Sequence, residues 1–250
     1  PDAGVLVLDY GGGTIDITTY TIRQSRGGQK GFEESLASIG GKCGSKTIDR
    51  NMYKLMNERY GSAWTAVSDN WKSPGSRYMT EFEDHKRNFG SMTSNSQDMT
   101  LRLRTRVEEL QGRAAPQYDV NEGEITLTAA DMQKCFDFVV AKILSLIKEQ
   151  LREVRRARAP KVNTIVQIGG FGDLQYLCRK VMDFCAGYDN LCPIVPNKPW
   201  SAIARGACLR GLGGALVEKR RCRRHYGTSL AQAFRSNIDA EGDDVYVDKY

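Results

Sequence analysis

The chain has 250 residues, of which 40% are hydrophobic and 26% charged, and its formal net charge is +6. This composition is typical of a globular protein and excludes disordered, collagen-like and disulfide-scaffold chains. The longest apolar stretch, 138–147, is short and interrupted by Lys142, so we expect no membrane span. The chain begins with Pro1 rather than Met and enters a buried-strand pattern by Val5. We therefore expect that a preceding segment is missing.

The first two predicted elements are strands joined by three glycines. Residues 5–8 form a continuous apolar run, and residues 14–22 alternate isoleucines with polar, often β-branched side chains. The connecting residues are Gly11, Gly12 and Gly13. Walker-type and Rossmann phosphate loops lead from a strand into a helix, so neither type of site is expected here.

The rest of the chain alternates between helical and strand patterns. A loop is predicted over 23–31, and a helix with Ile48 and Met52 on its apolar face follows Gly40-Gly41. Residues 61–79 have no clean period. Thr128 and Asp131 form a capping-box variant that opens an amphipathic helix of about 27 residues. Further elements are expected as a helix over 80–89, strands over 100–107, 124–127 and 164–168, a helix over 174–184, an extended proline-rich segment over 193–199, and a helix over 200–217 whose small residues suit close packing on a sheet.

This pattern is typical of the α/β class, with a mixed sheet and an inserted subdomain near residues 42–125. The seven cysteines are odd in number and form no CxxC pair, which favours reduced, mostly buried thiols in an intracellular protein. A metal site that uses His85 or His225 is the less favoured alternative.

The chemistry that the sequence predicts centres on Asp-Tyr-Gly-Gly-Gly-Thr, residues 9–14. Asp9 ends a strand and can hold a hydrated cation, the glycines offer bare N–H donors to phosphate, and the hydroxyl of Thr14 can contact the terminal phosphate. Cation, phosphate and water are the ingredients of phosphoryl transfer. On these residues alone, a plain glycine-rich hairpin turn remains the alternative. A second glycine turn, Gly169-Gly170, follows a predicted strand at the edge where α/β sheets bind ligands.

In this order, the motifs resemble the nucleotide-binding domain of the 70-kDa heat-shock protein family, in the actin-like ATPase superfamily. Residues 8–17 resemble its second phosphate motif and residues 165–172 its adenosine motif. The resemblance also covers 83–90, 125–131 and 202–208, which are similar to a nucleoside-binding helix, to the end of an inserted subdomain and to a connecting helix. The Gly-Gly-Phe sequence and the segment 223–227 favour the divergent branch typified by member 12, which lacks the usual peptide-binding domain.

The resemblance implies ATP or ADP and Mg²⁺ as ligands, and it implies a role for each matching residue. Asp9 and Thr14 would be catalytic, with Asp9 holding Mg²⁺ through water or positioning the attacking water. Nucleotide contacts are implied for the phosphate residues Gly11, Gly12, Gly13 and Thr14, for Gly40 and Gly41 near the ribose, for Glu83 and Lys86 at the nucleoside, for Arg87 at the base, and for Gly169, Gly170 and Phe171 on the other wall.

The implied fold is one lobe of an actin-like ATPase, which is ribonuclease H-like, with an inserted α+β subdomain. Residues 1–41 and 126–217 would be the core of the second lobe, 42–125 the inserted subdomain and 218–250 a charged tail. The family's first lobe does not precede Pro1, so we expect this chain alone to hydrolyse ATP negligibly. A cytoplasmic, chaperone-like protein with a nucleotide-gated cycle and an unknown protein partner or co-chaperone is implied for the complete protein.

Three positions depart from the family pattern, and three other functions stay open. Asp173 stands where typical members carry an arginine that stacks on adenine, Trp200 replaces an acidic residue, and Gly90 replaces a serine. Asp173 and Trp200 favour a degenerate, non-catalytic interaction module on the same fold. A sugar or acyl kinase of the superfamily is another alternative. A nucleic-acid binder is the third, but no aromatic residues interleave the basic segments 148–161 and 218–224, so solvated surface is favoured and nucleic acid is not expected.

Overall fold

The structure is a computed structural model that describes residues 3–24, 30–91, 99–103, 107–110, 117–213, 217–219 and 221. Its larger sheet has seven strands in the order β10-β3-β2-β1-β8-β9, with β4 also paired to β2. The β1–β2 and β2–β3 pairs are antiparallel, whereas β8 runs parallel to β1 and β9 parallel to β8. The strands are β1 (Ala3–Tyr10), β2 (Ile15–Gln24), β3 (Lys30–Glu34), β4 (Ile39–Gly41), β8 (Val162–Ile168), β9 (Cys192–Ile194) and β10 (Val217–Lys219).

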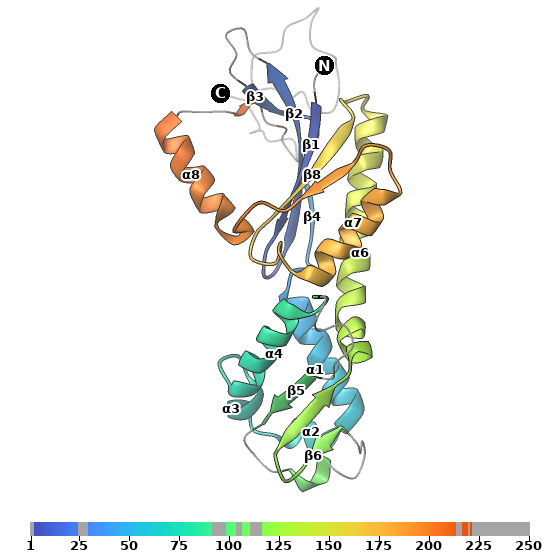
Figure 1. The fold of residues 1–250 in the computed structure, drawn as a ribbon, viewed down its shortest axis with the longest axis vertical. Helices are drawn as coiled ribbons and strands as arrows, with labels where there is room; N and C mark the ends of the chain where they lie inside the picture. The colour runs from blue at the N-terminus through green and yellow to red at the C-terminus, as the bar shows by residue number, and fades with distance from the viewer. Residues whose placement is uncertain are drawn as a thin grey trace, which may run out of the picture.

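The sheet is mixed and has helices on both sides (Figure 1), which confirms the α/β class. The glycines join strand to strand as predicted. The 23–31 loop prediction is wrong at both ends, because β2 continues to Gln24 and β3 begins at Lys30, where the two strands pair with each other. Neither Gln24 nor Lys30 belongs to an apolar pattern, so the sequence does not show that the two strands extend this far.

Alternation along β1 and β2 gives the hairpin two different faces. Leu6, Leu8, Tyr10, Ile15 and Ile17 are fully buried on one face. The neighbouring residues on the opposite face are only half-buried. The buried face is the one that the long helix α6 packs against, since Gln150 Nε2 of α6 donates a buried hydrogen bond of 3.0 Å to Thr19 Oγ1 of β2.

Helix α6 (Ala129–Arg156) has 28 residues and confirms the predicted amphipathic helix. Its N-terminus carries the predicted capping box: Asp131 N donates to Thr128 Oγ1 at 3.2 Å, and Thr128 N donates to Asp131 Oδ2 at 3.0 Å. The side chain of Asp131 also accepts from Arg59 at 2.7 Å. Two N-terminal backbone donors are thereby satisfied where a long helix begins beside the rest of the fold.

A second group of elements lies at one end of the molecule (Figure 1). It contains a three-stranded antiparallel sheet in the order β5-β7-β6. Two short helices, α2 and α3, occupy the stretch 61–79 that shows no clean period. The members are α1 (Lys46–Tyr60), α2 (Ser62–Ala66), α3 (Asp69–Lys72), α4 (Arg77–Asn88), β5 (Met99–Arg102), the 3-10 helix η1 (Glu108–Leu110), β6 (Tyr118–Asp119) and β7 (Glu124–Leu127).

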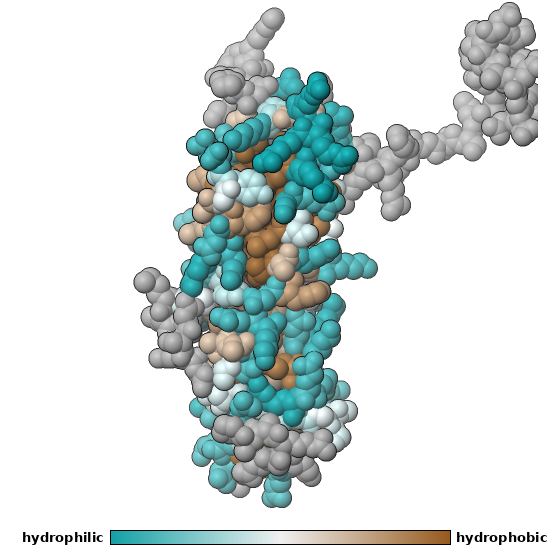
Figure 2. Space-filling view, turned by 90° about the vertical axis from the view of Figure 1, so that its right-hand side faces the viewer, coloured by the Kyte–Doolittle hydropathy of each residue, from teal (hydrophilic) through white to brown (hydrophobic). Residues whose placement is uncertain are grey.

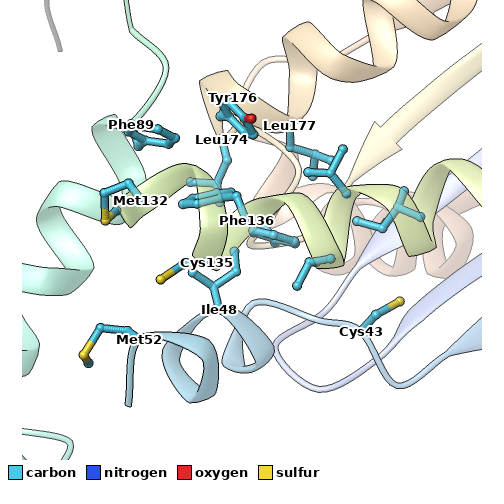
Figure 3. Packing of buried hydrophobic residues seen from close by; sticks show 14 of the residues in the cluster. Cys43, Ile48, Met52, Phe89, Met132, Cys135, Phe136, Leu174, Tyr176 and Leu177 are labelled. Carbon is cyan, nitrogen blue, oxygen red and sulfur yellow. The ribbon is translucent and has the colours of Figure 1, made fainter. Parts of the chain in front are cut away.

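The two groups share a hydrophobic core where α1, α6, α7 (Gln175–Ala186) and the end of α4 meet. Figure 3 shows their buried side chains pointing toward one another. Three aromatic rings form the centre of this junction, with centroid separations of 5.2 Å for Phe89–Phe136, 4.9 Å for Phe89–Tyr176 and 5.3 Å for Phe136–Tyr176. Aromatic pairs at these distances pack favourably beyond their buried area, so the junction fixes α4 against α7.

The C-terminal helix α8 (Ala202–Gly213) corrects one prediction. It forms within the predicted range after a 3-10 helix, η2 (Pro199–Ser201). It does not pack closely on the sheet but stands apart from it (Figure 1), and Leu212 is 87% exposed. Small residues permit close packing but do not specify a partner surface. Ile203 and Leu209 are also exposed, and Trp200 is 64% exposed.

The face that carries α6 and α7 is mostly hydrophilic, with hydrophobic residues gathered in its upper half (Figure 2). Within the described part of the chain, no helix is both long enough and apolar enough to cross a membrane. The cysteines described there are free; Cys43, Cys135 and Cys185 are buried, whereas Cys192 and Cys208 are exposed. Cys222, His225 and most of the 218–250 tail lie outside the described residues.

Candidate functional site

Two carboxylates face each other where the β1–β2 hairpin ends. Asp9 pairs with Asp16 across the antiparallel strands, and both side chains lie on the half-buried face. Burial, and then the nearby charge of Asp16, raise the pKa of Asp9 above its ordinary value. Thr14 Oγ1 donates to Asp16 Oδ2 at 3.4 Å. Asp16 was not among the predicted site residues; it stands opposite Asp9 because Tyr10 pairs with Ile15 across a four-residue turn, residues 11–14.

The glycine loop between these carboxylates is bound to the start of α1. The carbonyls of Gly11, Gly12 and Gly13 accept hydrogen bonds from Ser45 N at 3.3 Å, Lys46 N at 2.9 Å and Gly44 N at 3.3 Å. No side chain caps α1, so the loop satisfies N–H groups that a helix start otherwise leaves unpaired.

The same arrangement decides which backbone donors the loop can offer to a ligand. The N–H of Gly11 donates to Thr14 O at 2.9 Å and so closes the turn. Within the described residues, the N–H groups of Gly12 and Gly13 meet no protein acceptor, and both glycines are exposed. Two backbone donors are therefore available for an anion.

Glycines border the carboxylate pair on two sides. Gly40 pairs with Asp16 across β4 and β2, and a Cβ there would lie 2.9 Å from Asp16 Oδ1. Gly169 has a φ of +93°, and a Cβ there would lie 2.5 Å from Tyr10 O and 2.7 Å from Asp9 Oδ1. Asp9, Asp16, Gly40 and Gly169 therefore meet at one edge of the sheet. The left-handed conformation and the crowding both require glycine at position 169.

The other predicted residues near these glycines face different surroundings. A Cβ on Gly170 would meet open space, so no neighbouring atom covers this residue on its Cβ side. The side chain of Phe171 is buried edge-on against Tyr10, with ring centroids 6.1 Å apart, and only its backbone can face a ligand. A Cβ on Gly41 would lie 3.0 Å from Leu146 Cδ1 of α6, so this position faces the core.

A cavity of about 670 Å³ lies between α1 and α4. Glu83 and Arg87 of α4 line it and form an ion pair of 3.2 Å with each other. Burial alone would raise the pKa of Glu83, but Lys86 and Arg87 bind its ionised form and hold the pKa below its ordinary value. Glu83 is therefore a carboxylate acceptor at neutral pH, which suits ribose hydroxyls. Arg87 contacts Glu83 through Nε but is largely exposed, so the face of its guanidinium is open to a planar base.

Lys86 is only 2% exposed and lies behind Glu83. Its ammonium contacts Asp49 Oδ1 of α1 at 2.6 Å and Glu83 Oε2 at 2.5 Å. In this position the side chain links α4 to α1 and orients Glu83, while its direct contact with a nucleoside stays a prediction.

Two groups of predicted residues therefore exist, and Lys46 lies between them. The first group surrounds the hairpin end and the second lines the α1–α4 cavity. Lys46 lines the same cavity, and its Cε lies 3.9 Å from where a Cβ on Gly12 would stand. No sequence motif marks Lys46, because its proximity to the glycine loop depends on how α1 returns against the hairpin.

The serine-to-glycine departure at position 90 has a local cause. Gly90 has a φ of +91°, and a Cβ there would lie 2.5 Å from Tyr176 N. A serine therefore cannot replace it without moving α7 away from α4. Asp173 is exposed at the turn that precedes α7, so this position presents a carboxylate rather than a guanidinium.

The donor set fits Mg²⁺ better than a transition metal. Within the described part of the chain, no three His, Cys, Asp or Glu side chains gather as a metal cluster. Mg²⁺ keeps several waters and is usually bound by one or two carboxylates together with substrate phosphates. Asp9 and Asp16 are such a pair of carboxylates, and they stand beside backbone donors suited to phosphate.

Comparisons with known proteins agree with the resemblance found in the motifs. No protein-family model matches the chain. Human heat shock 70 kDa protein 12A is 26% identical over 92% of this chain, and the mouse 12A protein has the same identity and coverage. Human heat shock 70 kDa protein 12B is 24% identical over 92% of the chain. The chain spans 34–35% of the length of these relatives. It is thus related to the member-12 branch of the 70-kDa heat-shock protein family.

Proposed function

We propose that this chain is the second lobe of a heat-shock-70-like nucleotide-binding domain and that it binds Mg-ADP or Mg-ATP. The observation that carries this proposal is the position of the Asp9–Asp16 pair beside a glycine loop with two free N–H donors. Protein groups suited to bind a phosphate, a cation and a nucleoside lie in one region, from the glycine loop to the α1–α4 cavity. The divisions at residues 1–41, 42–125, 126–217 and 218–250 are part of the same proposal.

The glycine loop and the two carboxylates would bind the phosphates and Mg²⁺. Gly12 and Gly13 would donate to phosphate oxygens, and Thr14 would contact the terminal phosphate through its hydroxyl. Asp9 and Asp16 would hold the waters around Mg²⁺, which neutralises the charge on the phosphates when it is bound. Gly40 leaves room beside Asp16 for this hydrated cation. Contact of Gly40 and Gly41 with the ribose remains a prediction from the resemblance.

Nucleoside recognition would use the α4 side of the cavity and the backbone after β8. Glu83, oriented by Lys86, would accept hydrogen bonds from the ribose, and Arg87 would stack on the base. The backbone of Gly169, Gly170 and Phe171 would form the opposite wall. Asp173 supplies no second stacking guanidinium, so the base would be held less tightly than the phosphates.

In the complete protein, this lobe would take part in a nucleotide-gated conformational cycle with ATP hydrolysis. For this chain alone we propose binding with negligible turnover, since one lobe holds the phosphates from one side and excludes little water. A cytoplasmic location and a chaperone-like role with a protein partner remain predictions from the resemblance.

Isothermal titration calorimetry of the full 250-residue chain tests the proposal. We expect wild type to bind Mg-ADP more tightly than ADP with EDTA, and Asp9→Asn to lose this difference. Asp183→Asn, at an exposed position of α7, is the matched control and keeps it. Glu83→Gln weakens both ADP and adenosine, whereas Glu58→Gln on the exposed side of α1 weakens neither. Absence of ADP binding by wild type would refute the proposal.

A second candidate function is a non-catalytic interaction module. The exposed residues of α8 favour it, since the large apolar side chains of Ile203, Leu209 and Leu212 are left uncovered on one short helix. This function predicts that the chain folds without binding ADP. It also predicts that chemical shifts in nuclear magnetic resonance spectra do not change on addition of Mg-ADP.

A further inference from the structure

Two basic side chains stand between the glycine loop and the α1–α4 cavity. Lys46 and Arg50 are exposed, lie one helical turn apart on α1 and both line the cavity. In the described part of the chain neither side chain forms an ion pair, whereas Arg87 across the cavity is paired with Glu83. Like charges at this spacing repel and destabilise the helix.

The positive charge of Lys46 is unfavourable at its position in α1. Lys46 is the first residue of α1, where the helix dipole is positive and favours an anionic side chain. Ser45 precedes it without a capping hydrogen bond from its side chain. Residues that oppose local preferences in this way are expected at functional sites. An anion bound at this place would relieve both the repulsion and the conflict with the dipole.

The side chains, rather than the helix terminus, supply the positive charge here. The N–H groups at the start of α1 and just before it, those of Gly44, Ser45 and Lys46, already donate to the carbonyls of the glycine loop. The opposite side of the same loop offers the free N–H groups of Gly12 and Gly13. Because Cε of Lys46 lies 3.9 Å from the Cβ position of Gly12, the ammonium and these two donors border one space.

We propose that Lys46 and Arg50 bind the phosphate chain of the nucleotide, so that this lobe supplies its own cationic phosphate ligands from α1. The inference rests on the proposed function and adds two residues to it. Lys46 acts as a point charge beside the glycine loop, and Arg50 offers a planar fork one helical turn further along α1. The ligand class is a nucleoside di- or triphosphate, and adenosine should not depend on either residue.

Calorimetry of the full chain with three probes tests the inference. The probes are Mg-ADP, adenosine and tripolyphosphate, and the variants are Lys46→Gln and Arg50→Gln. Lys54→Gln, an exposed lysine of the same helix that does not line the cavity, is the matched control. We expect Lys46→Gln to weaken Mg-ADP and tripolyphosphate about tenfold each, as for one charge-assisted hydrogen bond. Arg50→Gln acts in the same direction, and adenosine binding stays unchanged in every variant.

The outcomes separate this inference from the proposed function. If Mg-ADP binds but Lys46→Gln and Arg50→Gln leave its affinity unchanged, the inference is wrong and the proposed function stands. If both variants weaken adenosine as much as Mg-ADP, the phosphate assignment is also wrong. If tripolyphosphate binds through Lys46 while neither ADP nor adenosine binds, the phosphate assignment holds and the proposed function is wrong. If none of the three probes binds wild type, both fail.

Discussion

Replacing Gly169 by alanine tests whether the backbone behind Asp9 is as crowded as the structure describes. With a φ of +93°, this residue lies in the left-handed region, where a Cβ costs about 1–2 kcal/mol. The new Cβ would also lie 2.5 Å from Tyr10 O and 2.7 Å from Asp9 Oδ1, so the strand end must shift. Together these effects should lower the free energy of unfolding by about 2–4 kcal/mol.

The matched control is Gly170→Ala at the next residue. Its Cβ would meet no atom within 4 Å, and its φ is not in the left-handed region, so we expect a change below about 0.5 kcal/mol. Urea unfolding followed by far-ultraviolet circular dichroism measures both variants. A loss of about 3 kcal/mol corresponds to a midpoint shift of about 1 M urea. Equal midpoints for the two variants would refute the reasoning, and calorimetry should also report weaker Mg-ADP binding for Gly169→Ala alone.

Three further predictions concern stability. Lys86→Met leaves the carboxylates of Asp49 and Glu83 facing each other without their shared cation, so urea unfolding should show a loss of about 2–4 kcal/mol; an unchanged midpoint would contradict the buried ion pair. Because folding raises the pKa of Asp9, its contribution to stability falls as pH rises from its ordinary pKa of 3.8 to the raised value. Asp9→Asn should therefore be more stable than wild type at neutral pH, and urea titrations from pH 4 to 7 that show it less stable would contradict this. Leu212→Gln should change the unfolding free energy by less than about 0.5 kcal/mol, since this residue is 87% exposed, and a larger loss in thermal unfolding would mean that α8 packs on the protein.

The parts of the fold that the sequence predicts well are those whose signals are local. Strand β1 reads as a continuous apolar run, and α6 combines a capping box with a long apolar face. Both follow from the chain's own periodicity. The helix of residues 202–213 also forms locally, but its packing was predicted wrongly, because small residues do not say which surface covers them.

The candidate site divides in the same way. Asp9 and the glycines were found because they are adjacent in the sequence and belong to a motif. Asp16 was missed because its place depends on strand register, and Lys46 because it depends on the return of α1 to the hairpin. The burial of Lys86 between two carboxylates likewise requires α1 and α4 to be placed together, which no local pattern encodes.

The hydrogen bonds between the glycine loop and α1 have a consequence for communication through the molecule. The carbonyl of Gly11 and the N–H of Gly12 belong to one peptide group, and the carbonyl accepts from Ser45 N. An anion that binds this N–H polarises the whole peptide unit and strengthens the acceptor on its other side. The peptide between Gly12 and Gly13 connects to Lys46 N in the same manner. Occupancy of the loop would thus slow amide hydrogen exchange at the first turn of α1, even though no ligand atom touches those amides.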